Sequence, residues 1–420
     1  MVYPNAYVIH KSNPRAGEKI FLSSSKSESN RSLILQALAG GKSTLKNLSD
    51  ARDTRIMENL LNSGETNLNV MDAGTTMRFL TAFFAVTNQH KILAGTARMN
   101  QRPIKLLVEA LRTIGAEIKY LDQPGYPPLE IRGFSGQKTN QIKIPGDISS
   151  QYISALLMIA PVLPNGLRLE ITGKINSLPY IEMTLQLMKK FGAKFTRYKE
   201  SLIEVHSSPY EAVEYVIESD WSGASYWFGL AALLDNYEIY LQGLKEDSLQ
   251  GDKSIMDIMR PLGVEATFKD ELLHLKNIPA EPSITYDFSG CPDLVQTAAV
   301  VCAAKGIEAN FSGVESLHIK ETDRIAALKN ELNKFGVILK ETKPGTIKLN
   351  AKEFKKGNKT KLETYDDHRM AMAFAPLGAI SSVIIHNPGV VEKSYPTFWD
   401  EFSRIGMNLE PLDSQSYLKM

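Results

Sequence analysis

One apolar, helix-like run recurs six times along the chain, each time behind a polar or charged front. From the second copy on, the starts are 74, 74, 70 and 74 residues apart, whereas the first gap is 46. A helix that is apolar on nearly all sides must be buried, so six buried helices are predicted. The copies read SNRSLILQAL, TTMRFLTAFF, SSQYISALLMIA, GASYWFGLAAL, DLVQTAAVVCAA and DHRMAMAFAPLGA, starting at Ser29, Thr75, Ser149, Gly223, Asp293 and Asp367.

An amphipathic helix is predicted after each apolar run, and short β-like segments such as AEIKYL and LIEVHS follow. Each of these helices ends in glycine, the residue expected where the chain turns left-handed past a helix. The glycines are Gly64, Gly115, Gly192, Gly263, Gly336 and Gly406. The repeating unit is therefore strand, buried helix, strand, amphipathic helix, strands.

Six such units predict an α/β (α+β) protein with two domains, each holding three units whose buried helices lie inside a layer of sheets. A chance alternation of helices in an ordinary α/β protein is the alternative, and the near-constant spacing argues against it.

Composition excludes several classes. The formal net charge of +1 gives no global field for nucleic acid or a membrane surface. No apolar stretch approaches the ~20 residues of a membrane span, and the N-terminus shows no signal-peptide core. The two cysteines, Cys291 and Cys302, are too far apart for a close metal-ligand pair and favour buried thiols in a reducing, cytoplasmic compartment.

The fronts of the predicted helices carry cations, where free N–H groups already favour anions. If equivalent ends converge, they make a site for small molecules that bear phosphate and carboxylate groups. The arginines are Arg31, Arg78, Arg102, Arg324 and Arg369, and the lysines are Lys26, Lys320 and Lys393. The carboxylates nearby are either structural partners or acid–base groups; they are Asp293, Glu321, Asp323 and Asp367.

Two signals of other chemistry are incomplete. GGKST resembles the end of a phosphate-binding P-loop, but Gln36 stands where that motif needs glycine, and a helix precedes it instead of a strand. The seven histidines show no HExxH or similar metal spacing. Only His368 stands in a charged cluster. No metal site is predicted.

A set of motifs occurs in a fixed order from near Ser25 to Phe398: SKSESNR, AGTTMR, QRPIKLLVEAL, GDISSQYISALLMIAP, SLPYIEMTLQLMKKFG, IKETDR and DDHRMAM. Together they resemble the 5-enolpyruvylshikimate-3-phosphate (EPSP) synthase family. The resemblance implies two domains of three βαβαββ repeats, an inverse α/β barrel. Residues 21–219 would hold repeats 1–3, residues 1–20 with 220–420 would hold repeats 4–6, and the active site would lie in the cleft between them. We expect that cleft to close when shikimate 3-phosphate binds.

The implied reaction transfers the enolpyruvyl group of phosphoenolpyruvate to the 5-hydroxyl of shikimate 3-phosphate and releases phosphate. It needs no metal or organic cofactor, and a monomer is expected, with no nucleic-acid or membrane partner. By position, shikimate 3-phosphate would bind Lys26, Ser27, Arg31, Ser149, Ser150, Gln151, Ser177, Asp293, Ser316 and Lys320. Phosphoenolpyruvate would bind Lys26, Gly74, Arg102, Gln151, Arg324, Arg369 and Lys393. Asp293 would take the hydroxyl proton, and Glu321, supported by Lys26, would protonate the methylene carbon.

Four departures from the family pattern stand near these motifs. Ser23-Ser24 replaces Pro-Gly, Asp72 and Ser316 each replace an asparagine, and Phe79 replaces a proline. An ionised Asp72 would repel phosphoenolpyruvate and the family's anionic inhibitor glyphosate, unless it turns toward Arg78 or another cation. We expect weaker glyphosate inhibition if it does not.

Two rivals remain. UDP-N-acetylglucosamine enolpyruvyl transferase has the same fold but usually a reactive cysteine in the first half, whereas both cysteines here lie in the second. A non-catalytic small-anion-binding protein of the same fold is the other rival.

Overall fold

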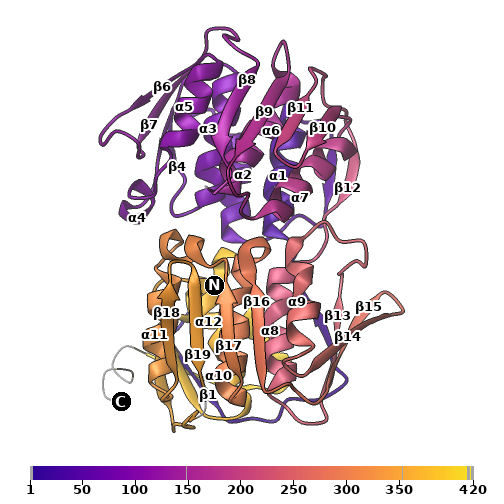
Figure 1. The fold of residues 1–420 in the computed structure, drawn as a ribbon, viewed down its shortest axis with the longest axis vertical. Helices are drawn as coiled ribbons and strands as arrows, with labels where there is room; N and C mark the ends of the chain where they lie inside the picture. Colours follow the sequence, from indigo (N-terminus) through magenta and orange to yellow (C-terminus); the bar gives the residue numbers. More distant parts are fainter. Residues whose placement is uncertain (1–2, 148, 352, 414–416, 418–420) are drawn as a thin grey trace. The chain divides into compact units, whose positions relative to one another are not determined.

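The computed structural model describes residues 3–147, 149–351, 353–413 and 417. The chain forms two compact units, drawn in Figure 1. The central unit is Ser24–Ile217, and the terminal unit combines Met1–Ser23 with Glu218–Met420. The chain therefore passes from one unit to the other after residue 23 and again after residue 217. The sequence predicted these boundaries after residues 20 and 219.

The apolar runs form the buried helices of both units. In α3, 11 of 13 residues are buried, including Phe79, Leu80 and Phe84. Within each unit the buried helices pack against one another, because an all-round apolar surface can be covered only by other core elements. They are α1 (Lys26–Leu38), α3 (Gly74–Val86) and α6 (Ser150–Ile159) in the central unit, and α8 (Trp221–Ala232), α10 (Val295–Lys305) and α12 (His368–Phe374) in the terminal unit.

The sixth run does not stay α-helical to its end. It passes into a 3-10 turn, η6 (Ala375–Ala379), whose second residue is Pro376. Proline has no N–H to donate, and its ring clashes with the carbonyl four residues earlier. The other helices of the structure are α2 (Arg52–Leu61), α4 (Ala97–Asn100), α5 (Lys105–Ile114), α7 (Leu178–Lys190), α9 (Ile255–Met259), α11 (Arg324–Asn333) and α13 (Phe398–Arg404).

The predicted left-handed glycines are confirmed after five amphipathic helices. Gly115, Gly192, Gly263, Gly336 and Gly406 have φ of 132°, 85°, 101°, 77° and 103°. The prediction was wrong for Gly64, because α2 ends earlier, at Leu61, and Asn62 caps it in a right-handed conformation.

The sheets repeat one pattern. Two parallel strands flank α3, α6, α10 and α12 in sequence, and antiparallel strands extend each of these sheets, as in β4–β5–β7–β6 and β16–β17–β19–β18. The central-unit strands are β3 (Thr44–Lys46), β4 (Asn67–Asn69), β5 (Lys91–Ala94), β6 (Ala116–Tyr120), β7 (Leu129–Phe134), β8 (Gln141–Pro145), β9 (Leu167–Thr172), β10 (Phe195–Lys199), β11 (Leu202–Val205) and β12 (Glu214–Val216). The terminal-unit strands are β1 (Ala6–His10), β2 (Lys19–Phe21), β13 (Glu238–Gln242), β14 (Val264–Lys269), β15 (Leu272–Asn277), β16 (Ser283–Asp287), β17 (Glu308–Ser312), β18 (Ile338–Lys343), β19 (Thr346–Asn350), β20 (Thr360–Leu362), β21 (Val383–His386) and β22 (Asn408–Leu412).

The first repeat departs from βαβαββ. Its amphipathic helix α2 is followed directly by β4, which opens the second repeat. Its sheet is the parallel pair β12–β3. The missing hairpin accounts for the first gap of 46 residues between apolar runs, where later gaps are 70 or 74.

The N-terminal segment belongs to the terminal unit. Strand β2 pairs parallel with β13 and opens the fourth repeat, while β1 lies between β21 and β22 and completes the sixth. In return, β12 comes from the far end of the central unit and pairs with β3 of the first repeat. In the described part of the chain, no helix is long and apolar enough to cross a membrane.

Candidate active site

Arg324, the first residue of α11, lies at the centre of a charged network in the terminal unit. It donates from Nε to Asp367 Oδ2 at 2.7 Å, from Nη1 to Asp293 Oδ1 at 2.8 Å and from Nη2 to Glu321 Oε2 at 2.9 Å. Burial alone would lower its pKa, but Asp367, Glu321 and Asp293 together raise it above the ordinary arginine value. A desolvated guanidinium with three carboxylates is a permanent, fixed cation.

Asp293 lies in the 3-10 turn η4 (Pro292–Leu294), immediately before α10. Its Oδ2 accepts from Arg369 Nη2 at 2.8 Å, and Lys320 Nζ lies 3.7 Å from its Oδ1. Burial alone would raise the pKa of Asp293, but Arg369, Lys320 and Arg324 outweigh it and hold that pKa well below its usual range. The carboxylate is therefore ionised throughout the neutral range in the free protein.

Two further cations complete the network. Lys393, at the end of η7 (Pro388–Lys393), places Nζ 3.6 Å from Glu321 Oε1 and is only 2% exposed. Arg369, in the first turn of α12, also donates to Tyr226 Oη at 3.4 Å. The structure thus joins six of the predicted site residues in one unit: Asp293, Lys320, Glu321, Arg324, Arg369 and Lys393. Ser316, half-buried in η5 (Glu315–Ile319), takes no part in the bonds just described.

Two of the four candidate carboxylates cap helices. Asp367 accepts from the backbone N–H of Arg369 at 2.9 Å and caps α12, and Asp323 accepts from that of Ala326 at 3.0 Å and caps α11. A capping carboxylate also faces the positive end of the helix dipole. Asp367 and Asp323 are therefore structural partners, which leaves Asp293 and Glu321 as acid–base candidates.

Sequence reasoning missed Asp252, which is only 4% exposed. Its carboxylate accepts from Ser222 Oγ, which itself lies 3.5 Å from Arg369 Nη2. Burial, and then the charge of Asp293, raise the pKa of Asp252 to about 7. Its place at the front of the fourth amphipathic helix was an available signal, since the equivalent fronts carry Arg102 and Arg324.

In the central unit, Arg31 is 2% exposed and joins three helices. It donates from Nε to Thr184 Oγ1 of α7 at 2.7 Å, from Nη2 to Ser154 Oγ of α6 at 3.2 Å, and from Nη1 to the carbonyl of Ser27 at 2.9 Å. Burial lowers its pKa to about 10. Neither Thr184 nor Ser154 was predicted, because each reads in the sequence as an isolated hydroxyl, Thr184 in an amphipathic helix and Ser154 in an apolar one.

Lys26 begins α1, behind the capping Ser25. Its Nζ lies 3.1 Å from Asp53 Oδ2, and Asp53 is a buried residue that sequence reasoning also missed. Ser27 follows in the first turn and is half-buried. The serine-rich opening of α1 therefore combines a helix N-terminus with an ion-paired lysine.

Gly74 is the first residue of α3, and the guanidinium of Arg102 lies against it. A methyl group on Gly74 would be 2.6 Å from Arg102 Nη1, closer than such atoms approach. Arg78, proposed from the sequence as a site cation, donates instead to the carbonyls of Gly74 and Pro103, both at 3.1 Å. It is 3% exposed and contacts the loop that carries Arg102.

Asp72 pairs with Arg52, whose Nη2 lies 2.8 Å from Asp72 Oδ1. The possibility that Asp72 turns toward another cation is therefore the one that the structure shows. Phe79 lies within α3, which is continuous from Gly74 to Val86. Phe79 is buried, and its ring lies 5.4 Å from the guanidinium carbon of Arg31.

The remaining predicted residues lie at the starts of α6 and α7. Ser149 caps α6 by accepting from the N–H of Gln151 at 3.3 Å, and Ser150 is the first residue of that helix. Gln151 donates from Nε2 to Thr75 Oγ1 of α3 at 3.0 Å. Ser177 precedes α7 with a left-handed φ of 56°.

Both cysteines are buried, as predicted. Across the described residues, no group of three or more histidine, cysteine, aspartate and glutamate side chains is placed to hold a metal ion.

The comparisons with known proteins all indicate the same family. The EPSP synthase (3-phosphoshikimate 1-carboxyvinyltransferase) family model matches residues 11–65 and 58–402. A 3-phosphoshikimate 1-carboxyvinyltransferase of Bacteroides fragilis is 44% identical over 395 residues, covering 93% of this chain and 96% of the relative. One from Pasteurella multocida is 35% identical, covering 92% and 95%.

Solved structures show the same fold. EPSP synthase from Acinetobacter baumannii superposes with a TM-score of 0.77 at 19% identity, over 96% of this chain and 99% of that one. The enolpyruvyl transferase NikO from Streptomyces tendae gives 0.75 at 12% identity, over 97% and 99%. The predicted family is therefore confirmed over the two rivals: the chain belongs to the EPSP synthase family and is an enolpyruvyl (carboxyvinyl) transferase.

Proposed function

We propose that this protein transfers the enolpyruvyl group of phosphoenolpyruvate to the 5-hydroxyl of shikimate 3-phosphate, in aromatic amino acid biosynthesis. The observation that carries the proposal is the network around Arg324, in which two potential acid–base carboxylates touch four cations. Fixed cations beside carboxylates suit a reaction that joins two anions and expels a third.

The terminal unit supplies cations for phosphoenolpyruvate. Arg324, Arg369 and Lys393 are nearly fully buried, so their charges are weakly screened and already oriented. Lys320 and Asp293 would bind the ring hydroxyls of shikimate, with Ser316 close to Lys320 in sequence. An ionised Asp293 only accepts hydrogen bonds and donates none, and its depressed pKa keeps it in that form.

The central unit would contribute the phosphate subsite and further residues for phosphoenolpyruvate. Three of the five N–H groups of Arg31 are used inside the protein, and the remaining two would serve the phosphate together with Ser27. The hydroxyls at the helix starts would add donors where the helix dipole favours an anion; they are Ser149, Ser150 and Ser177. Arg102, lying on Gly74, would join Lys26 and Gln151 at phosphoenolpyruvate.

In the addition step, the 5-hydroxyl oxygen bonds to C2 of phosphoenolpyruvate. Asp293 takes the hydroxyl proton while Glu321, supported by Lys26, delivers a proton to C3. In the elimination step, Glu321 recovers a proton from the new methyl group and phosphate leaves with the proton held by Asp293. Asp293 is a weak base in the free protein, and bound anions would offset its cations and strengthen it.

Because each unit carries only part of the set, both must contribute to turnover, and we propose that a monomer suffices. The decisive experiment is a phosphate-release assay in which either substrate is omitted in turn. Release that requires both substrates supports the proposal. Release with UDP-N-acetylglucosamine in place of shikimate 3-phosphate, or binding without release, would establish one of the rival functions.

A further inference from the structure

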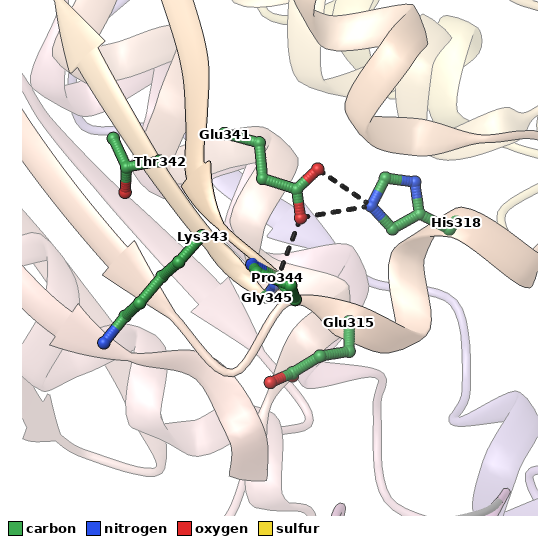
Figure 2. A pocket seen from close by; sticks show the side chains of 7 residues that line it. All are labelled: Glu315, His318, Glu341, Thr342, Lys343, Pro344 and Gly345. Atoms are coloured by element: carbon green, nitrogen blue, oxygen red, sulfur yellow. Dashed lines mark hydrogen bonds and ion pairs between the residues drawn. The ribbon is translucent and has the colours of Figure 1, made fainter.

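His318 lies in η5, two residues before Lys320, and both of its ring nitrogens face carboxylates. Nδ1 lies 2.9 Å from Asp323 Oδ2, and Nε2 lies 3.4 Å from both carboxylate oxygens of Glu341 on β18. Figure 2 shows His318 and Glu341 facing each other beside a surface hollow of about 450 Å³.

A neutral imidazole has one N–H donor, whereas both partners of His318 are carboxylates that only accept. The two contacts can be hydrogen bonds at the same time only when the ring carries two protons and a positive charge. The pKa of His318 is raised, first by the hydrogen bond to Asp323 and with a further contribution from Glu341. Its side chain is 36% exposed, so the ring exchanges protons with solvent.

The other charges around the ring do not replace this cation. Glu315 comes from the same 3-10 turn, and Lys343 comes from the β18–β19 hairpin and points away from the ring in Figure 2. Glu341 is anchored independently, because it also accepts from the N–H of Gly345 at 3.0 Å. Asp323 also has a second contact, since it accepts from the N–H of Ala326 at 3.0 Å, so His318 bridges two carboxylates that are each held by another bond.

That segment contains the proposed site residues. Lys320 and Glu321 lie between His318 and Asp323, and Arg324 follows directly. The bond from His318 to Asp323 closes this short loop at its base, and the contact with Glu341 fixes it to the sheet. Loss of the ring charge would leave only one of the two contacts as a hydrogen bond and weaken the hold on Lys320, whose Nζ lies 3.7 Å from Asp293.

We propose that His318, in its doubly protonated form, is a positioning residue that holds the Lys320–Arg324 segment in its substrate-binding conformation. This rests on the proposed function, in which Lys320 binds shikimate 3-phosphate. A histidine stabilised by partners contributes fully below its unperturbed pKa and loses its effect as pH rises through the raised value. Affinity for shikimate 3-phosphate should therefore fall across that range, while kcat changes less.

The test compares KM for shikimate 3-phosphate from about pH 6 to 9 in the wild type, His318→Gln and Glu341→Gln. We expect a rise of about threefold to fivefold in the wild type, typical of a partly exposed ion pair. In His318→Gln, KM should be raised already at low pH and stay flat. In Glu341→Gln, the rise should move to lower pH, because one stabilising charge is gone.

His10→Gln is the matched control, because His10 pairs with a single carboxylate, Glu410, at 2.6 Å and is 31% exposed. It should keep the wild-type profile. Titration of labelled histidine by NMR, with the His318 signal identified by its loss in His318→Gln, gives its pKa directly. An unshifted His318 pKa, or equal pH profiles in wild type and His318→Gln, would overturn the inference. Absence of turnover in the wild type would instead overturn the proposed function and leave the titration to test His318.

Discussion

Asp293→Asn should distinguish the role of Asp293 as a base from its role as the ion-pair partner of Arg324 and Arg369. The substitution keeps the shape of the side chain and removes its charge. We expect kcat to fall by roughly 10²-fold or more, as for loss of a general base. We also expect phosphoenolpyruvate to bind no more weakly than before, because Arg369 and Arg324 each lose a competing carboxylate that now lies 2.8 Å away.

The cost in stability follows from the same distances. Each 2.8 Å contact is worth about 6 kcal/mol at an effective dielectric near 20, but desolvation offsets most of it. Removing one member of a buried pair typically costs 3–5 kcal/mol, and Arg324 keeps Glu321 and Asp367. We therefore expect about 3 kcal/mol, which lowers the melting temperature of a unit this size by roughly 6–12 °C.

The assay that tests this reading is thermal unfolding with and without saturating phosphoenolpyruvate. An anion that replaces the lost carboxylate should raise the melting temperature more in Asp293→Asn than in the wild type. Equal stabilisation of both proteins would contradict the electrostatic account of the network. A kcat within tenfold of wild type would remove Asp293 from the role of base.

Three further predictions concern the central unit and the medium. Gly74→Ala should push Arg102 away and raise the KM for phosphoenolpyruvate by about tenfold, consistent with losing one charged contact; an unchanged KM would mean that Arg102 does not bind this substrate. Asp72→Asn should change the KM for phosphoenolpyruvate and the glyphosate inhibition constant by less than about threefold, because Arg52 already neutralises Asp72. Arg52→Gln should instead weaken the binding of both phosphoenolpyruvate and glyphosate. Much tighter binding of either anion in Asp72→Asn would mean that Asp72 repels them in the wild type. Affinity for phosphoenolpyruvate should decrease as salt rises from about 0.05 to 0.5 M, and a constant value would show that the cations do not attract it.

Much of the fold could be predicted because its strongest signal is periodic. An apolar run such as TTMRFLTAFF buries itself wherever it occurs, so the six core helices and their order followed from the sequence. The first repeat could not be predicted in detail. The gap of 46 residues indicates that the first repeat is shorter than the others. The sequence does not show that β12 pairs with β3 across some 170 residues, because this pairing depends on the assembled unit.

The candidate site was predictable where a charged residue begins a helix. Lys26, Arg324 and Arg369 stand at such fronts, and the structure gives each an ion-pair partner. Buried partners were harder to find, since Asp53 and Asp252 look in the sequence like ordinary surface residues of amphipathic helices. Their burial depends on which face the tertiary packing covers.

The placement of β1 and β2 governs how the chain is made. These strands are synthesised before the rest of the chain, yet β13, the partner of β2, follows only after the whole central unit, and β21 and β22, the partners of β1, come near the end. Residues 24–217 hold all three sheets assigned to the central unit among the described residues, so that unit can fold during translation while the leading segment waits unpaired. Because β1 is an inner strand of its sheet, that sheet can be completed only after β22 has been synthesised. A nascent chain therefore exposes a strand-forming segment for most of its synthesis, which makes it a natural binding target for chaperones.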